Sequence, residues 1–409
     1  MPVDHFSLEA IIRPNILALQ PYRCARDDYQ SGILLDANEN SYGHSIVKPN
    51  TKNNSNLSNG TSEETAFVAG QLETPLHRYP DPSHPLIKST YAKLRNIARV
   101  ENVFLGVGSD EVIDLLFRVS CVPGKDKVLI CPPTYGMYAV CAQINDVEVI
   151  RIPQDTTGGR LTVQADKVLE ATSNDSSIKL IFLCSPGNPT GAVVPLSTIQ
   201  TILESPSFKG LVIVDEAYID FTEASHPGQP ISATTLLPNY PNLVVLQTMS
   251  KSFGLAAIRL GFALSSPELN QILSNTKAPY NISAPTALIA MQALSEGSIT
   301  AMKEKVQKVI KGRTFLLDAF SKMTQDFGPY IGGLDANFIM VPVLNRQTGK
   351  PDNERAQKVY QAMAETQGVV VRFRGKELGC TGCLRVTVGT EEENEVLLER
   401  LATVFEQIQ

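Results

Sequence analysis

Short apolar runs alternate with amphipathic stretches between about residues 72 and 295 of this chain. Several of the runs contain no polar alternation, which is typical of strands that are covered on both faces of a sheet. Helix-like spacing lies between them, for example in Asp110–Val119 and Leu196–Leu203. This alternation predicts an α/β domain with a mostly parallel sheet flanked by helices. The runs that we interpret as strands are Val103–Val107, Lys127–Cys131, Val147–Ile152, Leu180–Cys184, Leu211–Val214, Leu243–Gln247 and Gly261–Leu264.

The pattern changes after about residue 296. A long helical stretch covers roughly Ile299–Met323, and a final helix begins at about Glu391. Between the two helices, three runs are interpreted as strands: Asn337–Val343, Val369–Arg374 and Leu384–Val388. Helices and strands segregated in this way predict a smaller α+β domain, which we expect the N-terminal segment to complete.

The chain therefore divides into four parts. Residues 1–47 are expected to be an N-terminal arm that contributes to the small domain and to the substrate pocket. Residues 48–70 are mostly Asn, Ser, Thr, Lys and Gly, which bury too little apolar surface to offset the entropy of ordering, so a polar, mobile insertion is predicted there. Residues 71–295 would form the large, ligand-binding domain and residues 296–409 the small one.

Composition and charge narrow the function classes. The 409 residues include 43% hydrophobic and 19% charged side chains, as in ordinary globular proteins. The net charge of −6 argues against a nucleic-acid surface, so an anion site would have to be built locally. No apolar run approaches the ~20 residues that span a bilayer. The opening residues, MPVDHFSLEA, lack a basic segment followed by an apolar one, so we expect a cytoplasmic protein that does not enter membranes.

The cysteines and histidines predict no metal site. The seven cysteines are scattered, and the pair Cys380 and Cys383 lacks two further ligands at a matching spacing, so reduced thiols are expected. The five histidines form no H-E-x-x-H pattern, and neither a G-x-S-x-G elbow nor a Walker loop is present.

Polar or aromatic residues follow five of the predicted strands. In open α/β sheets, ligands bind beyond the carboxyl ends of the strands, so five such groups predict one site. Each residue alone has an ordinary structural interpretation: Lys251 as a solvated charge, Asp215 as a turn residue, Ser109 as a helix N-cap. Their joint occurrence makes those interpretations weak. The five stretches are Gly108–Asp110, PPTYGMY (132–138), SPGNPTG (185–191), DEAY (215–218) and TMSK (248–251).

A lysine, an acid, an aromatic plate and a phosphate cradle together indicate pyridoxal 5′-phosphate. Lys251 would form a Schiff base with its aldehyde. Asp215 would lie against the pyridine nitrogen and keep it protonated, which makes the ring a better electron sink. Tyr135 would stack on the ring. Asn188 and Tyr218 would donate hydrogen bonds to the ring oxygen beside the aldehyde.

The cofactor's phosphate would lie at the start of a helix, where backbone N–H groups have no partners. Ser109 and Asp110 begin such a helix, Thr248 and Ser250 add hydroxyl groups, and Arg259 adds a guanidinium fork. The carboxylates of Asp110 and Glu111 would repel an anion if they faced it. Either the backbone alone holds the phosphate or this placement is wrong.

These motifs resemble those of the fold-type I pyridoxal-phosphate aminotransferases and, within them, the histidinol-phosphate aminotransferase family. The lysine, the acid and N-P-T-G are superfamily signals, whereas CPPTYGMY, RYP and GCLRVTVG point to the narrower family. Gly187 departs mildly from the SPNNPTG of many bacterial members. The shared stretches cover nearly the whole chain except 48–70, and they are DANEN (36–40), RYPDP (78–82), GSDE (108–111), CPPTYGMY (131–138), SPGNPTG (185–191), DEAY (215–218), Ser250 and Lys251 with Arg259, APY (278–280) and GCLRVTVG (382–389).

The resemblance implies a homodimer with a shared active site, in which Tyr79 reaches the cofactor phosphate of the neighbouring subunit. It places Tyr22, Asn38 and Tyr280 in the substrate pocket, and it implies a cis X-Pro bond near Asn188. The implied reaction converts L-histidinol phosphate and 2-oxoglutarate, reversibly, to imidazole-acetol phosphate and L-glutamate in histidine biosynthesis. Lys251, released from the cofactor, would be the general base.

Two arginines suggest how the substrates bind. If the strands at 369–374 and 384–388 pair as a hairpin centred between Leu378 and Gly379, Arg372 and Arg385 stand opposite each other. Facing like charges repel unless an anion lies between them, so we predict that a phosphate or carboxylate binds there. One pair could serve both histidinol phosphate and glutamate. Two solvated strand arginines remain the alternative.

Three other functions stay open at this point. A phospho-amino-acid decarboxylase would share every cofactor residue, and an aromatic amino-acid aminotransferase would share the reaction type. A non-catalytic binding protein is disfavoured because Lys251, Asp215 and Asn188 are all retained.

Overall fold

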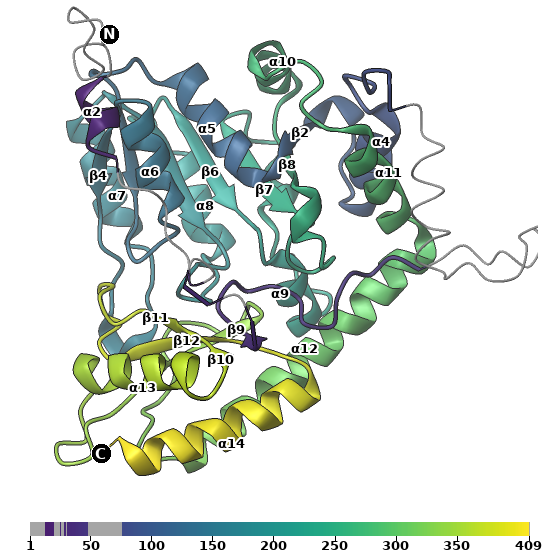
Figure 1. Ribbon diagram of the computed structural model, residues 1–409. Coiled ribbons are helices and arrows are strands. Elements are labelled where there is room, and N and C mark those ends of the chain that lie inside the picture. The colour runs from purple at the N-terminus through teal and green to yellow at the C-terminus, as the bar shows by residue number, and fades with distance from the viewer. Residues whose placement is uncertain (1–12, 20–24, 26–27, 30, 48–75, 409) are drawn as a thin grey trace, which may run out of the picture.

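The computed structural model describes residues 13–19, 25, 28–29, 31–47 and 76–408, and two layered parts meet in it (Figure 1). The larger part is built on a sheet with the strand order β2-β8-β7-β6-β5-β3-β4. All neighbouring strands from β7 to β4 are parallel, whereas β8 is antiparallel to both β2 and β7. The strands are β2 (Val103–Val107), β3 (Lys127–Ile130), β4 (Glu148–Arg151), β5 (Ile178–Cys184), β6 (Leu211–Asp215), β7 (Leu243–Thr248) and β8 (Leu260–Leu264).

Both faces of this sheet are covered by helices because its strands are apolar on both sides. Alternation along β6 places Ile213 in one core, with α5, α6 and α10, and Val212 and Val214 in the other, with α4, α7, α8 and α9. The predicted α/β fold with a mostly parallel, helix-flanked sheet is confirmed. The helices are α4 (Pro85–Leu94), α5 (Gly108–Ser120), α6 (Met137–Ile144), α7 (Ala165–Asn174), α8 (Leu196–Leu203), α9 (Ile219–Ser225), α10 (Pro267–Thr276) and α11 (Ala284–Ala293).

The smaller part combines an antiparallel sheet, in the order β11-β12-β9, with helices α12, α13 and α14. The N-terminal segment joins it, because β1 pairs in parallel with β10 through Ile33 and Val369. The elements are β1 (Ile33–Leu34), β9 (Phe338–Pro342), β10 (Val369–Val370), β11 (Arg372–Phe373), β12 (Cys383–Thr387), α12 (Glu296–Lys322), α13 (Asn353–Glu365) and α14 (Glu391–Gln407).

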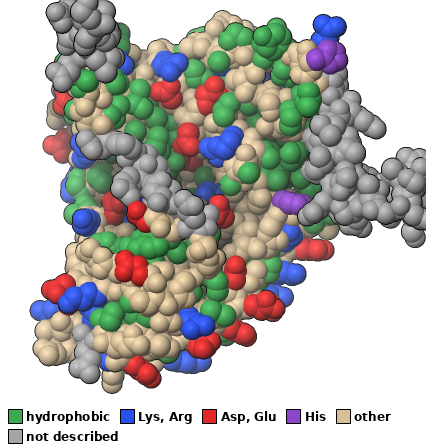
Figure 2. All heavy atoms as spheres, in the orientation of Figure 1, with side chains coloured by type: hydrophobic (Ala, Val, Ile, Leu, Met, Phe, Trp, Pro, Cys, Tyr) green, Lys and Arg blue, Asp and Glu red, His purple; other side chains and the backbone are tan. Residues whose placement is uncertain are grey.

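Local capping explains where the two long helices begin. The Ser295 side chain accepts a hydrogen bond from the Ser298 backbone, so α12 starts at Glu296 rather than at the predicted 299. Thr390 and Glu393 form a reciprocal capping box at the start of α14. The outward faces of these helices carry many charged side chains, as expected of amphipathic helices at a surface (Figure 2).

The N-terminal arm reaches further than predicted. Besides β1, its short helix α2 (Pro14–Leu17) lies against α6 of the large part, where the Arg13 guanidinium donates to the Ile144 carbonyl at 2.9 Å and Asn15 donates to the Gln143 carbonyl at 2.7 Å. The domain limits stay a prediction, and the predicted insertion at 48–70 lies outside the described residues. No helix in the described ranges is both long enough and apolar enough to cross a bilayer.

Candidate active site

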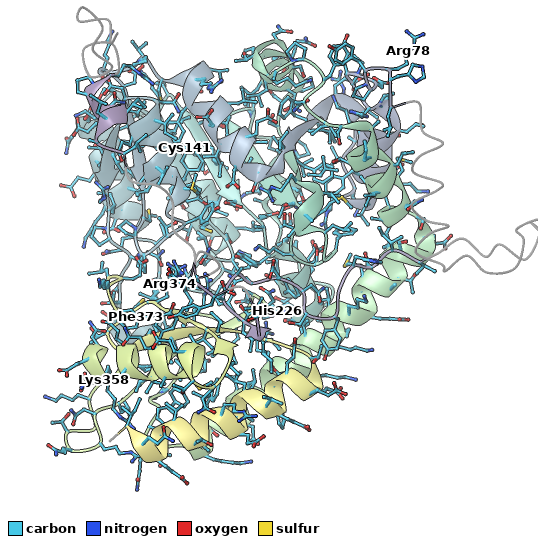
Figure 3. The ribbon with its side chains drawn as sticks, in the orientation of Figure 1. Arg78, Cys141, His226, Lys358, Phe373 and Arg374 are labelled. Carbon is cyan, nitrogen blue, oxygen red and sulfur yellow. The ribbon has the colours of Figure 1, made fainter. Side chains whose placement is uncertain are left out.

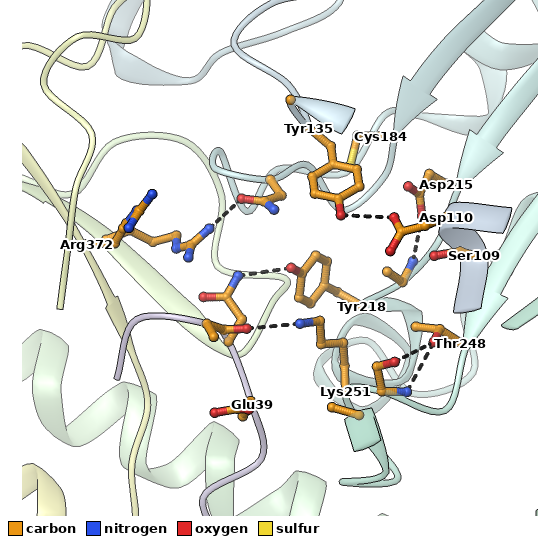
Figure 4. Close-up of a pocket in the computed structure, with 18 of the residues that line it drawn as sticks. Glu39, Ser109, Asp110, Tyr135, Cys184, Asp215, Tyr218, Thr248, Lys251 and Arg372 are labelled. Atoms are coloured by element: carbon orange, nitrogen blue, oxygen red, sulfur yellow. Dashed lines mark hydrogen bonds between the residues drawn. The ribbon is translucent and has the colours of Figure 1, made fainter. Parts of the chain in front are cut away.

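A cavity of about 500 Å³ opens beyond the carboxyl ends of β5, β6 and β7, where the large and small parts meet (Figure 4). Thirteen of the sixteen predicted site residues line it. Tyr79 and Tyr280 do not, and Tyr22 lies outside the described residues. The thirteen are Asn38, Ser109, Asp110, Tyr135, Asn188, Asp215, Tyr218, Thr248, Ser250, Lys251, Arg259, Arg372 and Arg385.

Lys251 lies three residues beyond the end of β7, and its amine points into the cavity. The Nζ atom donates a hydrogen bond to the Ala37 carbonyl at 3.0 Å and lies 5.8 Å from the centre of the Tyr218 ring. Burial, followed by the positive charge of Arg385, lowers the pKa of this amine to about 8. About a tenth of the amine is therefore uncharged at pH 7, far more than for an ordinary lysine, and the uncharged form is the one that acts as a nucleophile or a general base.

Asp215 is the last residue of β6 and is almost fully buried. Its Oδ2 accepts a hydrogen bond of 2.7 Å from the Tyr138 hydroxyl, and its Oδ1 accepts one of 3.3 Å from the Ala217 backbone. Burial raises the pKa of this carboxyl to about 6, although the bond from Tyr138 opposes the shift. A carboxylate desolvated in this way is stabilised by a cation beside it, such as a protonated ring nitrogen.

Tyr138 is a residue that sequence reasoning missed, although it belongs to the PPTYGMY stretch. It lies on α6 one turn beyond Tyr135, is fully buried and stacks on Phe182 with the ring centres 4.6 Å apart. Cys184, the pairing partner of Asp215 on β5, also lines the cavity. The available signal was its place in that stretch, three residues after Tyr135; the two rings meet edge to face with their centres 5.6 Å apart, although Tyr135 precedes the helix.

The residues that the sequence predicts as a phosphate cradle lie together near the start of α5. The Thr248 hydroxyl donates to Ser250 Oγ at 2.9 Å, and both side chains line the cavity beside Ser109. Gly108 has a φ of 68°, and a Cβ built there would stand 2.5 Å from the Arg259 guanidinium. Only glycine leaves room for that guanidinium at the helix start.

The two acids of this helix turn are placed differently, which resolves the conflict noted in the sequence. Asp110 does line the cavity, but its carboxylate accepts hydrogen bonds from Arg259 at 3.2 Å and from the Tyr135 hydroxyl at 3.0 Å. Glu111 accepts instead from the Val107 backbone and from Asn281. The charge of Asp110 is therefore paired with that of Arg259. The Gly108 N–H donates to the Arg259 carbonyl, and the next two residues of the turn, Ser109 and Asp110, line the cavity, where their N–H groups could bind an anion.

Asn38, Tyr218 and Asn188 form the wall between cradle and arginines. Asn38 donates through Nδ2 to the Tyr218 hydroxyl oxygen at 2.9 Å. Asn188 accepts a hydrogen bond from Arg385 through Oδ1 at 2.6 Å, which leaves its amide nitrogen as a donor. The peptide bond before Pro189 is cis, as the resemblance implied. Two amide side chains thus fix a phenol and a guanidinium at the cavity wall.

The predicted hairpin register is confirmed, because Arg372 pairs with Arg385. Both guanidinium-bearing side chains line the cavity, as does that of Arg374 (Figure 3). Arg385 is 4% exposed; it donates to Asn188 and to the Asp36 carbonyl, and it lies 5.4 Å from the Phe338 ring centre. Three arginines therefore line the cavity away from the cradle, and one of them, Arg374, pairs with Glu377 at 3.4 Å.

Tyr79 and Tyr280 stack on each other at the surface, with ring centres 4.6 Å apart and planes at 17°. They are 82% and 41% exposed. Their position outside this chain's own cavity differs from the prediction for Tyr280, which the resemblance placed in the substrate pocket. Within one subunit, the two rings form a projecting aromatic pair.

The residues present fit pyridoxal phosphate. A lysine of lowered pKa, a buried acid and the predicted cradle residues surround one cavity, and the Tyr135 ring lies beside them with its hydroxyl bonded to Asp110. Among the described residues, no group of three or more His, Cys, Asp or Glu side chains is arranged to hold a metal ion.

Comparisons with known proteins agree with this geometry. Residues 30–401 match the family model "Aminotransferase class I and II". The histidinol-phosphate aminotransferase of Candida maltosa is 47% identical over 98% of this chain and 99% of its own length. That of Schizosaccharomyces pombe is 46% identical over 98% of each. The crystal structure of histidinol-phosphate aminotransferase from Sinorhizobium meliloti, in complex with pyridoxal-5′-phosphate, superposes with a TM-score of 0.79 at 19% identity, covering 98% of this chain and 99% of that one, which shows the shared fold.

Proposed function

The chain belongs to the aminotransferase class I and II family, and from that premise we propose that it transfers the amino group of L-histidinol phosphate to 2-oxoglutarate. The products are imidazole-acetol phosphate and L-glutamate, and the reversible reaction is a step of L-histidine biosynthesis. The observation that carries the proposal is a cavity with Lys251 and Asp215 at one end and two opposed arginines at the other. The high identity to relatives of that name over nearly the full length supports it.

The cofactor is pyridoxal 5′-phosphate, whose ring accepts the electron pair released at the substrate's α carbon. Lys251 would hold the cofactor covalently. The buried carboxylate of Asp215 would bind the ring nitrogen of the cofactor. The cradle of Ser109, Thr248, Ser250 and Arg259 would bind the phosphate, with the backbone of Asp110. Tyr135 would cover one face of the ring.

Proton movement falls to Lys251. Because its pKa is about 8, the amine can accept a proton from the substrate's α carbon at neutral pH and donate that proton again later in the same reaction. The hydroxyl of Tyr218 and the amide nitrogen of Asn188 lie on the same cavity wall and would donate hydrogen bonds that orient the reacting group.

The arginine pair accounts for two alternating substrates. Histidinol phosphate carries a phosphate and glutamate carries a carboxylate at a comparable position, and a guanidinium fork binds either anion. Arg372 and Arg385 are held opposite each other before any ligand arrives, which favours an anion between them. Asn38 would help to shape this pocket through its bond to Tyr218.

We further propose a homodimer that works in the cytoplasm. The exposed stack of Tyr79 on Tyr280 suits a role in a neighbouring subunit's site, because neither ring lines this chain's own cavity. The described cysteines carry free thiols, which suits a reducing compartment. The role of Tyr22 rests on the resemblance alone.

A donor panel tests the function. The purified, cofactor-loaded enzyme would be assayed with 2-oxoglutarate and histidinol phosphate, histidine, phenylalanine or threonine phosphate. We expect histidinol phosphate to give the highest kcat/KM. Preference for phenylalanine would point to an aromatic aminotransferase, and carbon dioxide release without 2-oxoglutarate would point to a decarboxylase. Lys251→Arg, which retains the charge but presents no primary amine, should be inactive with every donor.

A further inference from the structure

A second cavity, of about 470 Å³, lies at the β2 edge of the large sheet. Its walls are the start of α4, the strand β2, the end of α10 and the loop that follows α10 (Figure 1). It shares no lining residue with the active-site cavity, although the two have similar volumes. It is therefore a separate feature of the molecule that the proposed reaction does not use.

The lining of this cavity is cationic and polar. It contains Lys88, Lys277 and His84, and among the described residues it contains no aspartate or glutamate. Hydroxyl and amide side chains complete it, including Ser274, Gln271 and Asn281. A cation cluster without acids is unexpected in a chain whose net charge is −6.

The acids nearest these cations are engaged with other groups. Asp81 attracts Lys88, but its Oδ1 accepts hydrogen bonds from the Ser83 hydroxyl at 2.8 Å and from two backbone N–H groups. Glu111 attracts Lys277, but its carboxylate accepts from the Val107 backbone and from Asn281. Lys277 itself donates to the side-chain oxygen of Asn281 at 2.8 Å. Neither carboxylate lines the cavity, and among the described residues neither forms an ion pair with Lys88 or Lys277.

Burial and mutual repulsion act on the two lysines together. Desolvation lowers the pKa of both amines, and the charge of Lys277 lowers that of Lys88 further. The pKa of His84 is lowered as well, first by burial. Two ammonium groups that are partly withdrawn from water and close enough to repel are stabilised by an anion between them.

We propose that this cavity is a binding site for a small anion of the phosphate or carboxylate class, held by Lys88 and Lys277. The hydroxyl and amide groups of the lining would donate further hydrogen bonds. A cavity of this size accommodates a phosphorylated or dicarboxylic metabolite.

The site is placed to influence the aromatic pair. Pro82 and Ser83 follow the segment that carries Tyr79, and Pro279 and Asn281 flank Tyr280; all four line the cavity. Asn281 also donates to Glu111 in the first turn of α5. In the proposed function, on which this consequence rests, Tyr79 acts in a neighbouring subunit. An anion bound in this second cavity would then hold in place the segment that carries Tyr79.

The test uses the reactivity of the lysines in the cofactor-loaded enzyme. Acetylation by a limiting amount of acetic anhydride would be measured by mass spectrometry with and without inorganic phosphate, and in parallel with succinate. At tenfold excess over the dissociation constant, labelling of Lys88 and Lys277 should slow by roughly tenfold, because mass action leaves about a tenth of the sites empty. Lys209, which is exposed in the loop before β6 and lines neither cavity, is the internal control.

Protection by phosphate would assign a phosphate-bearing ligand, and protection by succinate a carboxylate-bearing one. Unchanged labelling with both anions would overturn the proposal, and so would lysines that are unreactive even without anions, because the cavity would then be covered.

A second measurement uses the double variant Lys88→Met and Lys277→Met, which removes the charges but keeps similar side-chain volume. It should lose part of the rise in Tm that phosphate gives the parent enzyme, whereas Lys88→Arg should retain it; an equal rise in parent and double variant would also contradict the site.

This experiment is independent of the reaction. An enzyme that fails the donor panel but shows protected lysines retains the anion site and loses the proposed function. An active enzyme whose lysines are not protected would retain the proposed function and lose the anion site.

Discussion

Asp215 and Glu216 are adjacent carboxylates on opposite faces of the same sheet, and they do different things. Both are almost fully buried, and burial raises the pKa of Asp215 to about 6 and that of Glu216 to about 7. Glu216 faces the core beneath α4, where its oxygens accept from Ser232 at 2.7 Å, from the Ala233 backbone at 2.6 Å and from Gln247 at 2.9 Å. It does not line either large cavity.

The difference shows that a perturbed pKa alone does not identify a catalytic residue. Glu216 has three donors and no open volume beside it, so it ties the end of β6 to β7 and to the loop at Ser232. Asp215 has fewer donors, an open cavity and a reactive amine across it. The cavity that Asp215 lines, and that Glu216 does not, distinguishes the proposed catalytic acid from the structural one.

The largest effect is expected for Asp215→Asn, which tests whether Asp215 is needed for catalysis. The amide cannot stabilise a protonated ring, so kcat should fall by roughly 10²- to 10³-fold, equivalent to about 3–4 kcal/mol for a broken buried pair. Steady-state kinetics with histidinol phosphate, alongside urea unfolding, checks this. The stability of the variant should remain close to that of the parent, and a catalytically normal variant would show that Asp215 is also only structural.

The matched change, Glu216→Gln, should give the opposite pattern. Its amide nitrogen would face the donors that the carboxylate now accepts from, so the free energy of unfolding should fall by about 1–3 kcal/mol. The kcat of the folded fraction should be unchanged. Urea unfolding followed by circular dichroism gives the first quantity, and cofactor-normalised turnover the second. A large loss of kcat at normal stability would show that Glu216 also acts in catalysis, and would contradict the distinction between the two acids.

The pH dependence of stability sharpens the comparison. The folded pKa of Glu216 is about 7 against an ordinary value of 4.5, so between these pH values the folded state holds a proton that the unfolded state has released. Its contribution is therefore complete below pH 4.5 and is lost as the pH rises through 7. We expect a fall of the order of 1–2 kcal/mol between about pH 5 and about pH 8. The slope should be flatter in Glu216→Gln, measured by urea unfolding; equal slopes would contradict the assignment.

The smallest effect is expected for Tyr138→Phe. Loss of its hydroxyl removes the hydrogen bond that opposes the raised pKa of Asp215, so that pKa should rise further. A net hydrogen bond of about 0.5–1.5 kcal/mol corresponds to a change in kcat of up to roughly tenfold. The pH profile of kcat should shift to higher pH on its acidic side, whereas Tyr330→Phe at the surface should leave it unchanged. An unmoved profile would make Tyr138 a packing residue.

The sequence predicted which strand-end residues meet in the cavity better than it predicted the contacts around them, for physical reasons. Lys251, Asp215 and Ser109 follow strands whose apolar character is local, and parallel strands bring their ends together. Arg372 and Arg385 were paired correctly because they lie at equal distances in the sequence from the centre of the hairpin between Leu378 and Gly379, and no bulge shifts the register. Tyr138, by contrast, contacts Asp215 across 77 residues, and no short-range pattern encodes which buried ring meets which acid.

Other features depended on three-dimensional context in the same way. The antiparallel placement of β8 between β2 and β7 could not be deduced from apolar runs, which do not state strand direction. Asp110 looked repulsive in the sequence, and only the approach of Arg259, from 149 residues away, pairs its charge. Tyr280 was predicted to line the substrate pocket, but it does not line the cavity of its own chain.

Arg385 has a consequence for biogenesis. Its guanidinium joins the carbonyl of Asp36, near the chain's beginning, to the amide of Asn188, in its middle, while its own backbone belongs to a strand near the end. The proposed anion site therefore needs three segments that lie far apart in the sequence. A truncated chain that ends before β12 would lack this site even after the central sheet had formed.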